Sequence, residues 1–401
     1  MANVSSSNGL EKRPKLAFRR ADGSSFPGWS RTSLSSIIEP YSEKVYGEHK
    51  YEVLTSSREG LQRQVDHFGS EQRHDTDGYN VIPFGYCTYR NRSDDGRFAF
   101  NINTISSNAI VSKFYPVFRF TNANSLFMSE FLNSSSRAKK KLSVLAVGTS
   151  QVVLSFEALK AAEFDLPCKD EQDKIASFFE CLNRRIEYQR TLVDALKKYK
   201  RGLLHGLISK TLRFSHKEKW GRVKLGKVFK ERSERANGDE ELLAVTINAG
   251  VQRRTNLDLK DNSSKDKSNY KRVQKGDIAY NTMRMWQGAS GASMYDGIVS
   301  PAYTVITPQA PDHVNIQFWA YYFKYAPLVQ TFQKYSQGLT SDTWNLKFPQ
   351  FSEIFVSNPP LEEQNEIATM LQAIDRRITS EEGRLSSICQ MKSSLYAQLF
   401  I

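Results

Sequence analysis

Two short stretches of the chain carry residue types that could do chemistry. The first runs from Asn358 to Leu361 and reads Asn-Pro-Pro-Leu, which approaches the Asn-Pro-Pro-aromatic loop that holds a flipped base in adenine methyltransferases. Leu361 stands where that loop needs an aromatic ring. A related stretch at residues 166–169 reads Leu-Pro-Cys-Lys. No glycine-rich cofactor loop precedes the stretch from Asn358 to Leu361. We therefore interpret both stretches as turns that lead into helices.

The second candidate, residues 206–211, resembles the end of a phosphate-binding loop. It lacks the glycine that should precede its lysine, and it lies at the end of a predicted helix instead of before one. The four cysteines, Cys87, Cys168, Cys181 and Cys389, are far apart and form no CxxC pair, which argues against a zinc site or a disulfide framework. We expect a chain that is not an enzyme by itself and that binds no metal or cofactor.

The composition favours an anionic partner. The chain has 401 residues, with 56 Lys and Arg against 43 Asp and Glu, a formal net charge of +13 and 12% aromatic residues. Cationic and aromatic side chains together are typical of nucleic-acid binding, although a solvated basic surface without a partner would have the same composition. There is no apolar run near 18 residues and no signal peptide, so we expect a soluble, intracellular protein.

Loop residues in each half of the chain could contact DNA. Arginine pairs best with guanine, and asparagine or glutamine with adenine, while lysine and arginine also hold phosphates. In the first half, the loop with Arg90, Asn91, Arg92 and Arg97 is polar enough to read bases, and Lys113 is a further predicted DNA contact. Those in the second half are Asn281, Arg284, Trp286 and Gln287 for bases, and Lys271, Arg272 and Lys275 for phosphates. Each of them could instead be an exposed side chain without a role.

The elements that must position these loops include a stretch that occurs twice. Residues 167–209 return as residues 359–401 at a constant offset of 192. The identical pairs include Glu171/Glu363, Gln172/Gln364, Arg184/Arg376, Arg185/Arg377 and Lys200/Lys392. Each copy begins with a proline followed by an acidic turn, which is typical of a helix start. We predict a long helix in each copy.

Apolar residues in both copies recur at alternating steps of four and three, the spacing of a coiled-coil seam. In the first copy they are Ile175, Phe179, Leu182, Ile186, Val193, Leu196, Leu203 and Leu207, and in the second Ile367, Leu371, Ile374, Ile378, Leu385, Ile388, Leu395 and Leu399. Polar residues interrupt the seam at matching places, Gln189 and Glu381 at one and Lys200 and Lys392 at the other. Matched defects would fix the register of two helices that pack on each other. The alternative is an ordinary amphipathic helix used twice.

The duplication extends beyond the two helices. Trp29 matches Trp220 and Leu34 matches Leu225, both at an offset of 191. Strand-like runs at 80–90, 96–102 and 109–120 have counterparts at 275–284 and 297–308, rich in β-branched and aromatic residues and separated by glycine turns. The loops between these anchors differ freely. A duplicated frame with dissimilar loops is what two modules would have if each reads something different.

The predicted fold is therefore α+β, with a pseudo-twofold internal repeat of two similar mixed α/β domains separated by two long helices. The expected bounds are a flexible tail over 1–13, a first domain over 14–165, a first helix over 166–210, a second domain over 211–357 and a second helix over 358–401.

A family resemblance rests on these repeated residues. The pattern PxxEEQxxIAxxLxxIDxRI, complete from Pro359 to Ile378 and partial from Pro167 to Ile186, is its main carrier. It occurs together with the segment that contains Leu212, Phe214, Trp220, Leu225 and Gly226. The chain, from about Pro14 onward, thereby resembles the specificity subunits of type I restriction–modification systems.

The resemblance implies two target-recognition domains and two spacer helices that pair as an antiparallel coiled coil. Members of this prokaryotic, cytoplasmic family read a bipartite double-stranded DNA target, one half-site per domain, and have no chemistry of their own. They recruit two modification subunits, which bind S-adenosylmethionine and methylate adenine, and can carry restriction subunits that use ATP and Mg. We expect the modification subunits on the outward helix faces, at Arg184, Arg185, Arg376 and Arg377.

Two other interpretations stay open at this point. A stand-alone methyltransferase would need a cofactor loop that the chain lacks. A coiled-coil scaffold without a DNA role predicts no salt-dependent DNA binding, whereas DNA contact predicts an affinity that falls steeply as salt rises, through counterion release.

Overall fold

Two units divide the chain in the computed structural model. Unit 1 comprises the described residues of Met1–Arg190 and Gly383–Ile401, and unit 2 comprises those of Thr191–Glu382. The structure describes residues 14–70, 75–214, 219–236, 240–247, 250–257, 266–340 and 343–400. The tail predicted over residues 1–13 lies outside this range.

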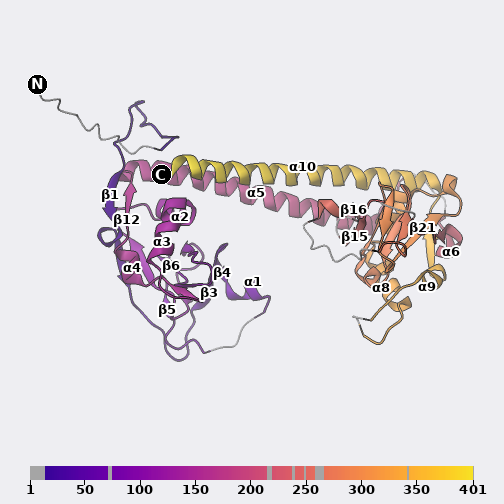
Figure 1. Ribbon diagram of the computed structural model, residues 1–401, viewed down its shortest axis with the longest axis horizontal. Helices are drawn as coiled ribbons and strands as arrows, with labels where there is room; N and C mark the ends of the chain where they lie inside the picture. Colours follow the sequence, from indigo (N-terminus) through magenta and orange to yellow (C-terminus); the bar gives the residue numbers. More distant parts are fainter. Residues whose placement is uncertain are drawn as a thin grey trace, which may run out of the picture. The chain divides into compact units, whose positions relative to one another are not determined.

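Two long helices occur where the repeat predicts them, α5 (Lys169–Ile208) and α10 (Leu361–Leu399) (Figure 1). Both helices begin three residues later than the predicted bounds, because Leu166 and Asn358 still belong to strands. Each helix contributes one part to unit 1 and the other part to unit 2.

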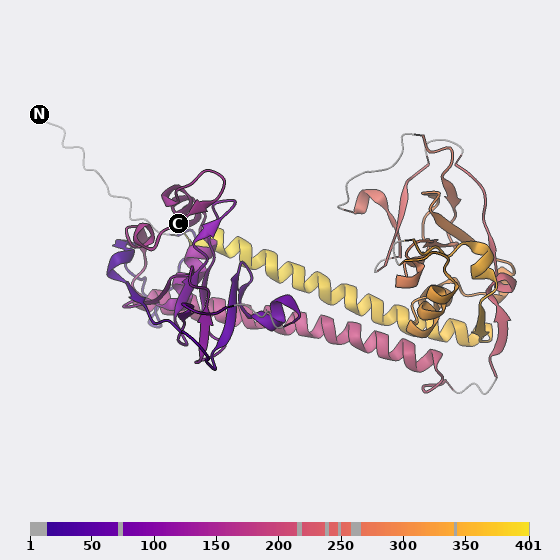
Figure 2. The ribbon, with the colours of Figure 1, turned by 90° about the horizontal axis from the view of Figure 1, so that it is seen from below.

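The two helices contact each other within each unit, and they lie side by side in both ribbon views (Figures 1 and 2). In unit 1 the rings of Phe179 and Tyr396 stack with centroids 4.7 Å apart. In unit 2 the Nζ of Lys200 lies 2.6 Å from an Asp375 oxygen, and Lys197 Nζ lies 2.7 Å from Glu382.

The other elements of unit 1 are short. Its strands are β1 (Ser30–Ser33), β2 (Ile38–Tyr41), β3 (Glu52–Ser57), β4 (Gly60–Arg63), β5 (Asn80–Val81), β6 (Cys87–Tyr89), β7 (Arg92–Ser93), β8 (Phe100–Ile102), β9 (Ala109–Val111), β10 (Val117–Phe120), β11 (Val152–Val153) and β12 (Glu163–Leu166). Its helices are η1 (Leu34–Ser36), α1 (Gln64–Phe68), α2 (Ser125–Ser134), α3 (Ser136–Leu145) and α4 (Phe156–Lys160).

Unit 2 has a corresponding set. Its strands are β13 (Gly221–Lys224), β14 (Phe229–Glu231), β15 (Leu243–Thr246), β16 (Gly250–Arg253), β17 (Lys271–Val273), β18 (Ile278–Asn281), β19 (Ser290–Ala292), β20 (Gly297–Val299), β21 (Tyr303–Pro308) and β22 (Phe355–Asn358). Its helices are α6 (Leu225–Val228), η2 (Arg254–Asn256), η3 (Met285–Gln287), η4 (Pro311–His313), α7 (Ile316–Tyr322), α8 (Ala326–Tyr335) and α9 (Phe348–Ser352).

The two units share part of their strand order. Unit 1 has a four-stranded sheet in the order β2-β10-β6-β8, and unit 2 has one in the order β14-β21-β18-β19. The strand that precedes each long helix pairs antiparallel with the strand that opens its unit, β12 with β1 and β22 with β13. One four-stranded sheet and one antiparallel strand pair therefore have the same order in the two units, whereas the remaining strands form β4-β3-β9-β5 and β11-β7 in unit 1 and β15-β16 and β17-β20 in unit 2.

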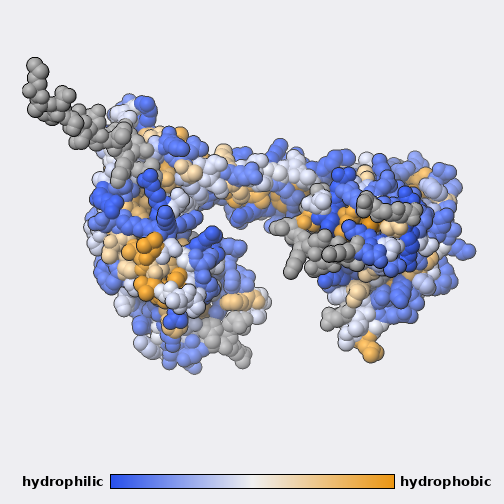
Figure 3. Space-filling model, in the orientation of Figure 1, coloured by the Kyte–Doolittle hydropathy of each residue, from blue (hydrophilic) through white to orange (hydrophobic). Residues whose placement is uncertain are grey.

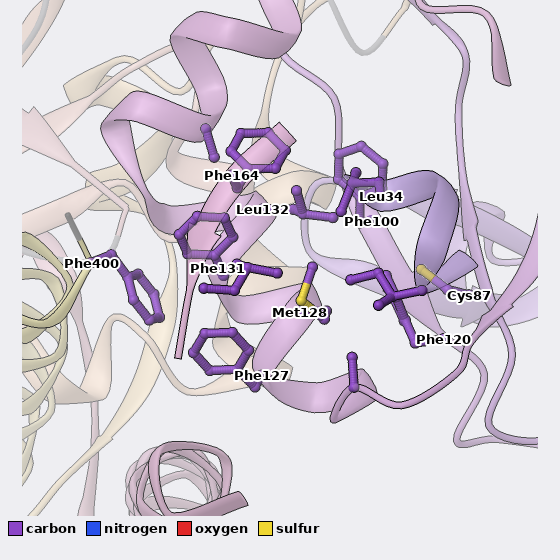
Figure 4. Close-up of a cluster of buried hydrophobic side chains, with 14 of the residues drawn as sticks. Leu34, Cys87, Phe100, Phe120, Phe127, Met128, Phe131, Leu132, Phe164 and Phe400 are labelled. Carbon is purple, nitrogen blue, oxygen red and sulfur yellow. The ribbon is translucent and has the colours of Figure 1, made fainter. Parts of the chain in front are cut away.

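Each core joins sheet, short helices and the ends of both long helices. In unit 1, Phe400 from the α10 segment packs against Phe127 and Phe131 of α2, and the rings of Phe131 and Phe400 are 5.5 Å apart (Figure 4). In unit 2 the core gathers Phe318, Trp319, Phe323, Phe332 and Phe351, together with seam residues of α5 and α10. Many seam residues thus bury against a domain core as well as against the facing helix.

The polar residues of the seam have partners. Lys200 binds Asp375, whose other oxygen accepts a 2.6 Å hydrogen bond from Tyr321. Lys392 lies 3.5 Å from Glu130, which also accepts hydrogen bonds from Tyr396 and Asn183. Burial and the neighbouring carboxylate raise the pKa values of Tyr321 and Tyr396, so both phenols stay protonated donors.

A repeated glutamine ties each long helix to its unit. The Oε1 of Gln172 accepts a 2.9 Å hydrogen bond from the backbone N–H of Asn124, and its Nε2 donates to the Pro167 carbonyl at 2.9 Å. Gln364 makes the same two bonds, to Asn315 and Pro359, each at 2.9 Å. Asn124 and Asn315 in turn cap the N-termini of α2 and α7.

Candidate nucleic-acid interface

The loops predicted to read DNA follow matching glycine turns. Gly85 (φ 83°) precedes β6 and Gly276 (φ 93°) precedes β18, a left-handed backbone that favours glycine. The Gly85 N–H donates to the Asn103 carbonyl at 2.8 Å, and the Gly276 N–H donates to Ser293 at 3.0 Å. The same turn therefore leads into a different loop in each unit.

In unit 1 the loop after β6 forms one wall of a pocket lined by arginines, which we call the arginine pocket. Its volume is about 100 Å³, and its arginines are Arg58, Arg90, Arg92 and Arg97. Arg58 comes from the turn between β3 and β4, and the other three come from β7 and its flanking turns.

A tight turn over residues 93–97 holds the acidic side of the arginine pocket. The Arg97 N–H donates to Ser93 Oγ at 3.1 Å and to Asp95 at 3.2 Å. Gly96 has a φ of 71°, which strains any other residue, and a Cβ there would lie 2.6 Å from Ser143 Oγ, so Ser143 would have to shift. Hydrogen bonds from Arg58, at 2.6 Å, and from Ser93 lower the pKa of Asp95 to about 2, so Asp95 stays ionised.

The rim of the arginine pocket carries an exposed aromatic ring. Phe114, in the turn between β9 and β10, is 53% exposed. The Arg92 guanidinium lies 5.4 Å from the centroid of this ring, and Lys113 Nζ lies 5.8 Å from it. Phe114 thus brings the predicted contacts Arg92 and Lys113 together through cation–π interactions.

Asn91 lies differently from its arginine neighbours. Its backbone carbonyl accepts from the Leu154 N–H at 2.9 Å, and its side-chain Oδ1 is buried without a hydrogen-bond partner in the described structure. The other predicted residues of this loop, Arg90, Arg92 and Arg97, are exposed. Asn91 therefore offers a base no accessible side-chain acceptor in this conformation.

In unit 2 the loop after β18 is held by its own side chains. Asn281 Oδ1 accepts from the Met283 N–H at 3.0 Å, and Trp286 Nε1 donates to the Met283 carbonyl at 3.0 Å. Trp286 also meets Trp344 edge-on, with centroids 5.2 Å apart. Arg284 and Gln287 are exposed, and neither side chain forms a hydrogen bond or ion pair within the described residues.

The three cations predicted to hold phosphates in unit 2 differ in availability. Lys271 bonds Glu231 at 3.1 Å, and its side chain is only 15% exposed. Arg272 is 3.3 Å from Glu240. Lys275 is exposed, with its backbone N–H anchored to Asp296 at 2.8 Å. Of the three, Lys275 is the most accessible to an external phosphate.

The arginines predicted to bind other subunits all lie on exposed faces of the long helices. Arg184 and Arg185 on α5 have no ion pair to the described residues. Arg377 on α10 is engaged, because its guanidinium lies 2.8 Å from the buried carboxylate of Glu381. Arg376 is exposed beside the Tyr321 phenol, whose pKa it acts to lower against the stronger effect of burial.

Three residues that contact the predicted loops or line the arginine pocket were not expected at the site from the sequence. Arg58 lies far from the Arg90 loop in sequence, Gln151 donates to Asp94 at 2.9 Å, and Trp344 supports Trp286. Gln151 lies in the segment that follows α3, and Trp344 lies in the segment that follows α8. The duplication could have pointed to these segments, but their contacts with the loops predicted to bind DNA appear only in the three-dimensional structure.

Hydrophilic side chains cover most of the visible face of each unit (Figure 3). Within the described ranges, no three His, Cys, Asp or Glu residues are grouped so that they could hold a metal ion. No helix of the described chain combines the length and apolarity needed to cross a lipid bilayer.

Two comparisons with solved structures show the same fold. The S subunit of the type I restriction–modification system from M. genitalium aligns over 97% of this chain and 99% of its own, with a TM-score of 0.57 and 16% identity. A structure described as the structural basis of complex assembly and conformational transition of the type I R-M system aligns over 93% of this chain and 98% of its own, with a TM-score of 0.54 and 14% identity.

The sequence also matches a family model in both halves. The model describes the type I restriction modification DNA specificity domain, and it matches residues 39–198 and 217–390. These two matches span most of the chain and take in both loops that were predicted to contact DNA. The chain belongs to the family of type I restriction–modification DNA specificity subunits.

Proposed function

We propose that this chain reads a bipartite DNA sequence for a type I restriction–modification enzyme, with one half-site bound by each unit. The observation that carries the proposal is one strand topology used twice with two different loops at its glycine turns. Two copies of one frame with different reading residues suit two unlike half-sites. The net charge of +13 suits a polyanionic target.

In this proposal α5 and α10 form an antiparallel coiled-coil spacer, and the two target-recognition domains are related by a pseudo-twofold axis. The helix contacts in each unit support such pairing. The chain acts without chemistry of its own: S-adenosylmethionine belongs to two modification subunits that methylate adenine, and ATP and Mg belong to restriction subunits.

The test is to co-express the chain with its modification subunit in a host without DNA methylation and to map methyladenine across the genome. We expect a single motif of two short half-sites around a fixed gap. Replacing residues 211–357 by the corresponding segment of another family member should change one half-site only. Expression of the modification subunit alone is the control, and methylation that stays the same without this chain would refute the proposal.

Scaffolding of the modification subunits is tested at the exposed arginines. Reversing the charge of Arg184 and Arg185 should weaken the assembly on a sizing column. These two are better targets than Arg377, whose loss would also leave the buried Glu381 carboxylate without its partner. An assembly that survives the double reversal intact would exclude this helix face.

A further inference from the structure

The arginine pocket has more positive charge than its own carboxylates neutralise. Asp94 is the one acidic side chain among its lining residues, and it already accepts a hydrogen bond from Gln151. Asp95, beside the pocket, binds Arg58 at 2.6 Å and lies 3.8 Å from Arg97. Arg90 and Arg92 have no carboxylate partner among the residues that the structure describes.

The pocket wall is held in place before any ligand arrives. Ser57 Oγ donates to the Gly60 carbonyl at 3.1 Å, Ser56 Oγ accepts from Asn101 at 2.8 Å, and Ser93 Oγ donates to Asp95 at 2.9 Å. These serines therefore use their donors or acceptors within the protein. Among the described residues, the guanidinium groups of Arg90 and Arg92 remain without a carboxylate partner, and a guanidinium presents several N–H groups in a fixed plane.

The lining chemistry separates an oxyanion from a base. A flipped or stacked base needs aromatic or apolar faces around it. The pocket is lined by arginines, serines and Asp94, with Ala99 as its apolar member. Several guanidinium groups around one small space are suited to the tetrahedral oxygens of a phosphate, which they bind through charge-assisted hydrogen bonds.

We propose that the arginine pocket binds one phosphate of the DNA backbone and so fixes the register of unit 1 on its half-site. This assigns Arg90, Arg92 and Arg97 a positioning role, in place of the base reading expected from the sequence, and adds Arg58 to them. Lys113, held at the rim over Phe114, lies where it can contact the adjacent backbone. The proposal rests on the proposed DNA-reading function.

Arg90→Ala is the cleanest probe, because Arg90 is exposed and no carboxylate of the described residues loses an ion-pair partner when Arg90 is replaced. The full-length chain is titrated onto two duplexes, one with the mapped target and one with its bases scrambled, over a series of salt concentrations. We expect affinity to fall by the same factor on both duplexes, and the slope of log K against log salt to decrease in magnitude by about 1. Arg137→Ala, an exposed arginine of α3 outside the pocket lining, is the control for loss of one charge.

A second measurement locates the phosphate. Neutral methylphosphonate is placed at single backbone positions of the target duplex. At one position the substitution should lower the affinity of the unaltered chain for the duplex, and at that position it should not lower the affinity of Arg90→Ala any further. Arg90→Lys should keep the salt slope, because the charge is retained.

The outcomes separate the two proposals. If Arg90→Ala relaxes the preference at one base pair and leaves the salt slope unchanged, Arg90 reads a base and the phosphate proposal is wrong. If Arg90→Ala behaves as Arg137→Ala in both respects, the pocket does not contact DNA. If the unaltered chain shows no salt-dependent binding to either duplex, the proposed DNA-reading function itself fails.

Discussion

In unit 1 the turn after β6 leads into Arg90–Arg97, whereas in unit 2 the turn after β18 leads into Asn281–Gln287. The two loops follow equivalent strands of the two four-stranded sheets, and each of these strands is preceded by a glycine with positive φ. The first loop joins Arg58 to form a pocket rich in guanidinium groups. The second folds over its own backbone and rests on Trp344.

This difference shows which residues maintain the fold and which are free to vary. Residues that hold the frame, such as Gln172 and Gln364, make the same bonds in both units. Residues on the loops share neither type nor geometry. We infer that the shared frame places the two loops, and that the residues of each loop decide whether its contact is to a phosphate or to a base. The following predictions test the two sides of this comparison, beginning with the largest expected effect.

The largest effect concerns a buried ion pair found in unit 2. Arg232 bonds both oxygens of Asp277, at 2.7 and 3.2 Å, and Asp277 is 2% exposed. Asp277→Ala should lower the free energy of unfolding of unit 2 by about 3 kcal/mol, since it leaves a largely buried guanidinium poorly compensated. Hydrogen exchange measured separately on peptides of each unit is the readout.

The control for Asp277→Ala is Glu163→Gln in unit 1, which removes an exposed pair with Arg31 at 3.1 Å. We expect a loss below about 1 kcal/mol there. Equal losses for the two substitutions would contradict the assignment of Asp277 to the core of unit 2.

The shared frame itself is tested by Gln172→Ala and Gln364→Ala. Each should cost about 1–3 kcal/mol of its own unit's stability, because a buried N–H and a buried carbonyl lose their partners. Denaturant unfolding followed by exchange in each unit measures both losses. Gln390→Ala, on an exposed position of α10, is the control. A loss confined to one unit would show that the two frames are not equivalent.

The loop side of the comparison is tested by Arg284→Ala. We expect DNA binding to weaken by about 1–3 kcal/mol and one base position of a single half-site to become relaxed. Methylation mapping of the assembled enzyme reports the base preference, and titration reports the affinity. Lys230→Ala, an exposed cation on β14, is the control. An unchanged motif with unchanged affinity would remove Arg284 from the reading surface.

The smallest effect concerns two glycines of α5. A Cβ at Gly202 would meet no atom within 4 Å, so Gly202→Ala should stabilise unit 2 by about 0.5–1 kcal/mol through better helix propensity. At Gly206 a Cβ would lie 2.6 Å from Leu212 Cδ1, and Leu212 must shift. Gly206→Ala should therefore gain less or nothing in thermal unfolding. Equal gains would mean that Leu212 is free to move.

Near their C-terminal ends, the two long helices make the same backbone hydrogen bond at equivalent positions of the repeat. The Gly206 carbonyl accepts from Leu212 N–H at 2.9 Å in unit 2, and the Gln398 carbonyl accepts from Leu16 N–H at 3.1 Å in unit 1. The helices and strands could be predicted because their periodicity and their repetition are local features of the chain. Gly85, Gly276 and the paired glutamines could be singled out for the same reason.

The candidate site was only partly predictable. The charged loops are visible in the sequence, but the Arg58 contribution depends on a β-turn brought beside them by the sheet. Lys271 has the type of a phosphate ligand, yet its bond to Glu231 depends on a contact between strands. Such pairings across the fold decide which charges are free, and residue spacing does not contain them.

The division of the chain between the units has a consequence for synthesis on the ribosome. Unit 2 is built from one continuous stretch, Thr191–Glu382, whereas the core of unit 1 includes Leu399 and Phe400. Domains generally fold in the order in which they emerge, with the N-terminal one first. Here the core of unit 1 is complete only after the last segment of α10 has been synthesised, because Leu399 and Phe400 belong to it. Unit 2 can therefore finish folding before unit 1. Until that last segment is in place, Phe127 and Phe131 lack the Phe400 ring that packs against them in the folded unit.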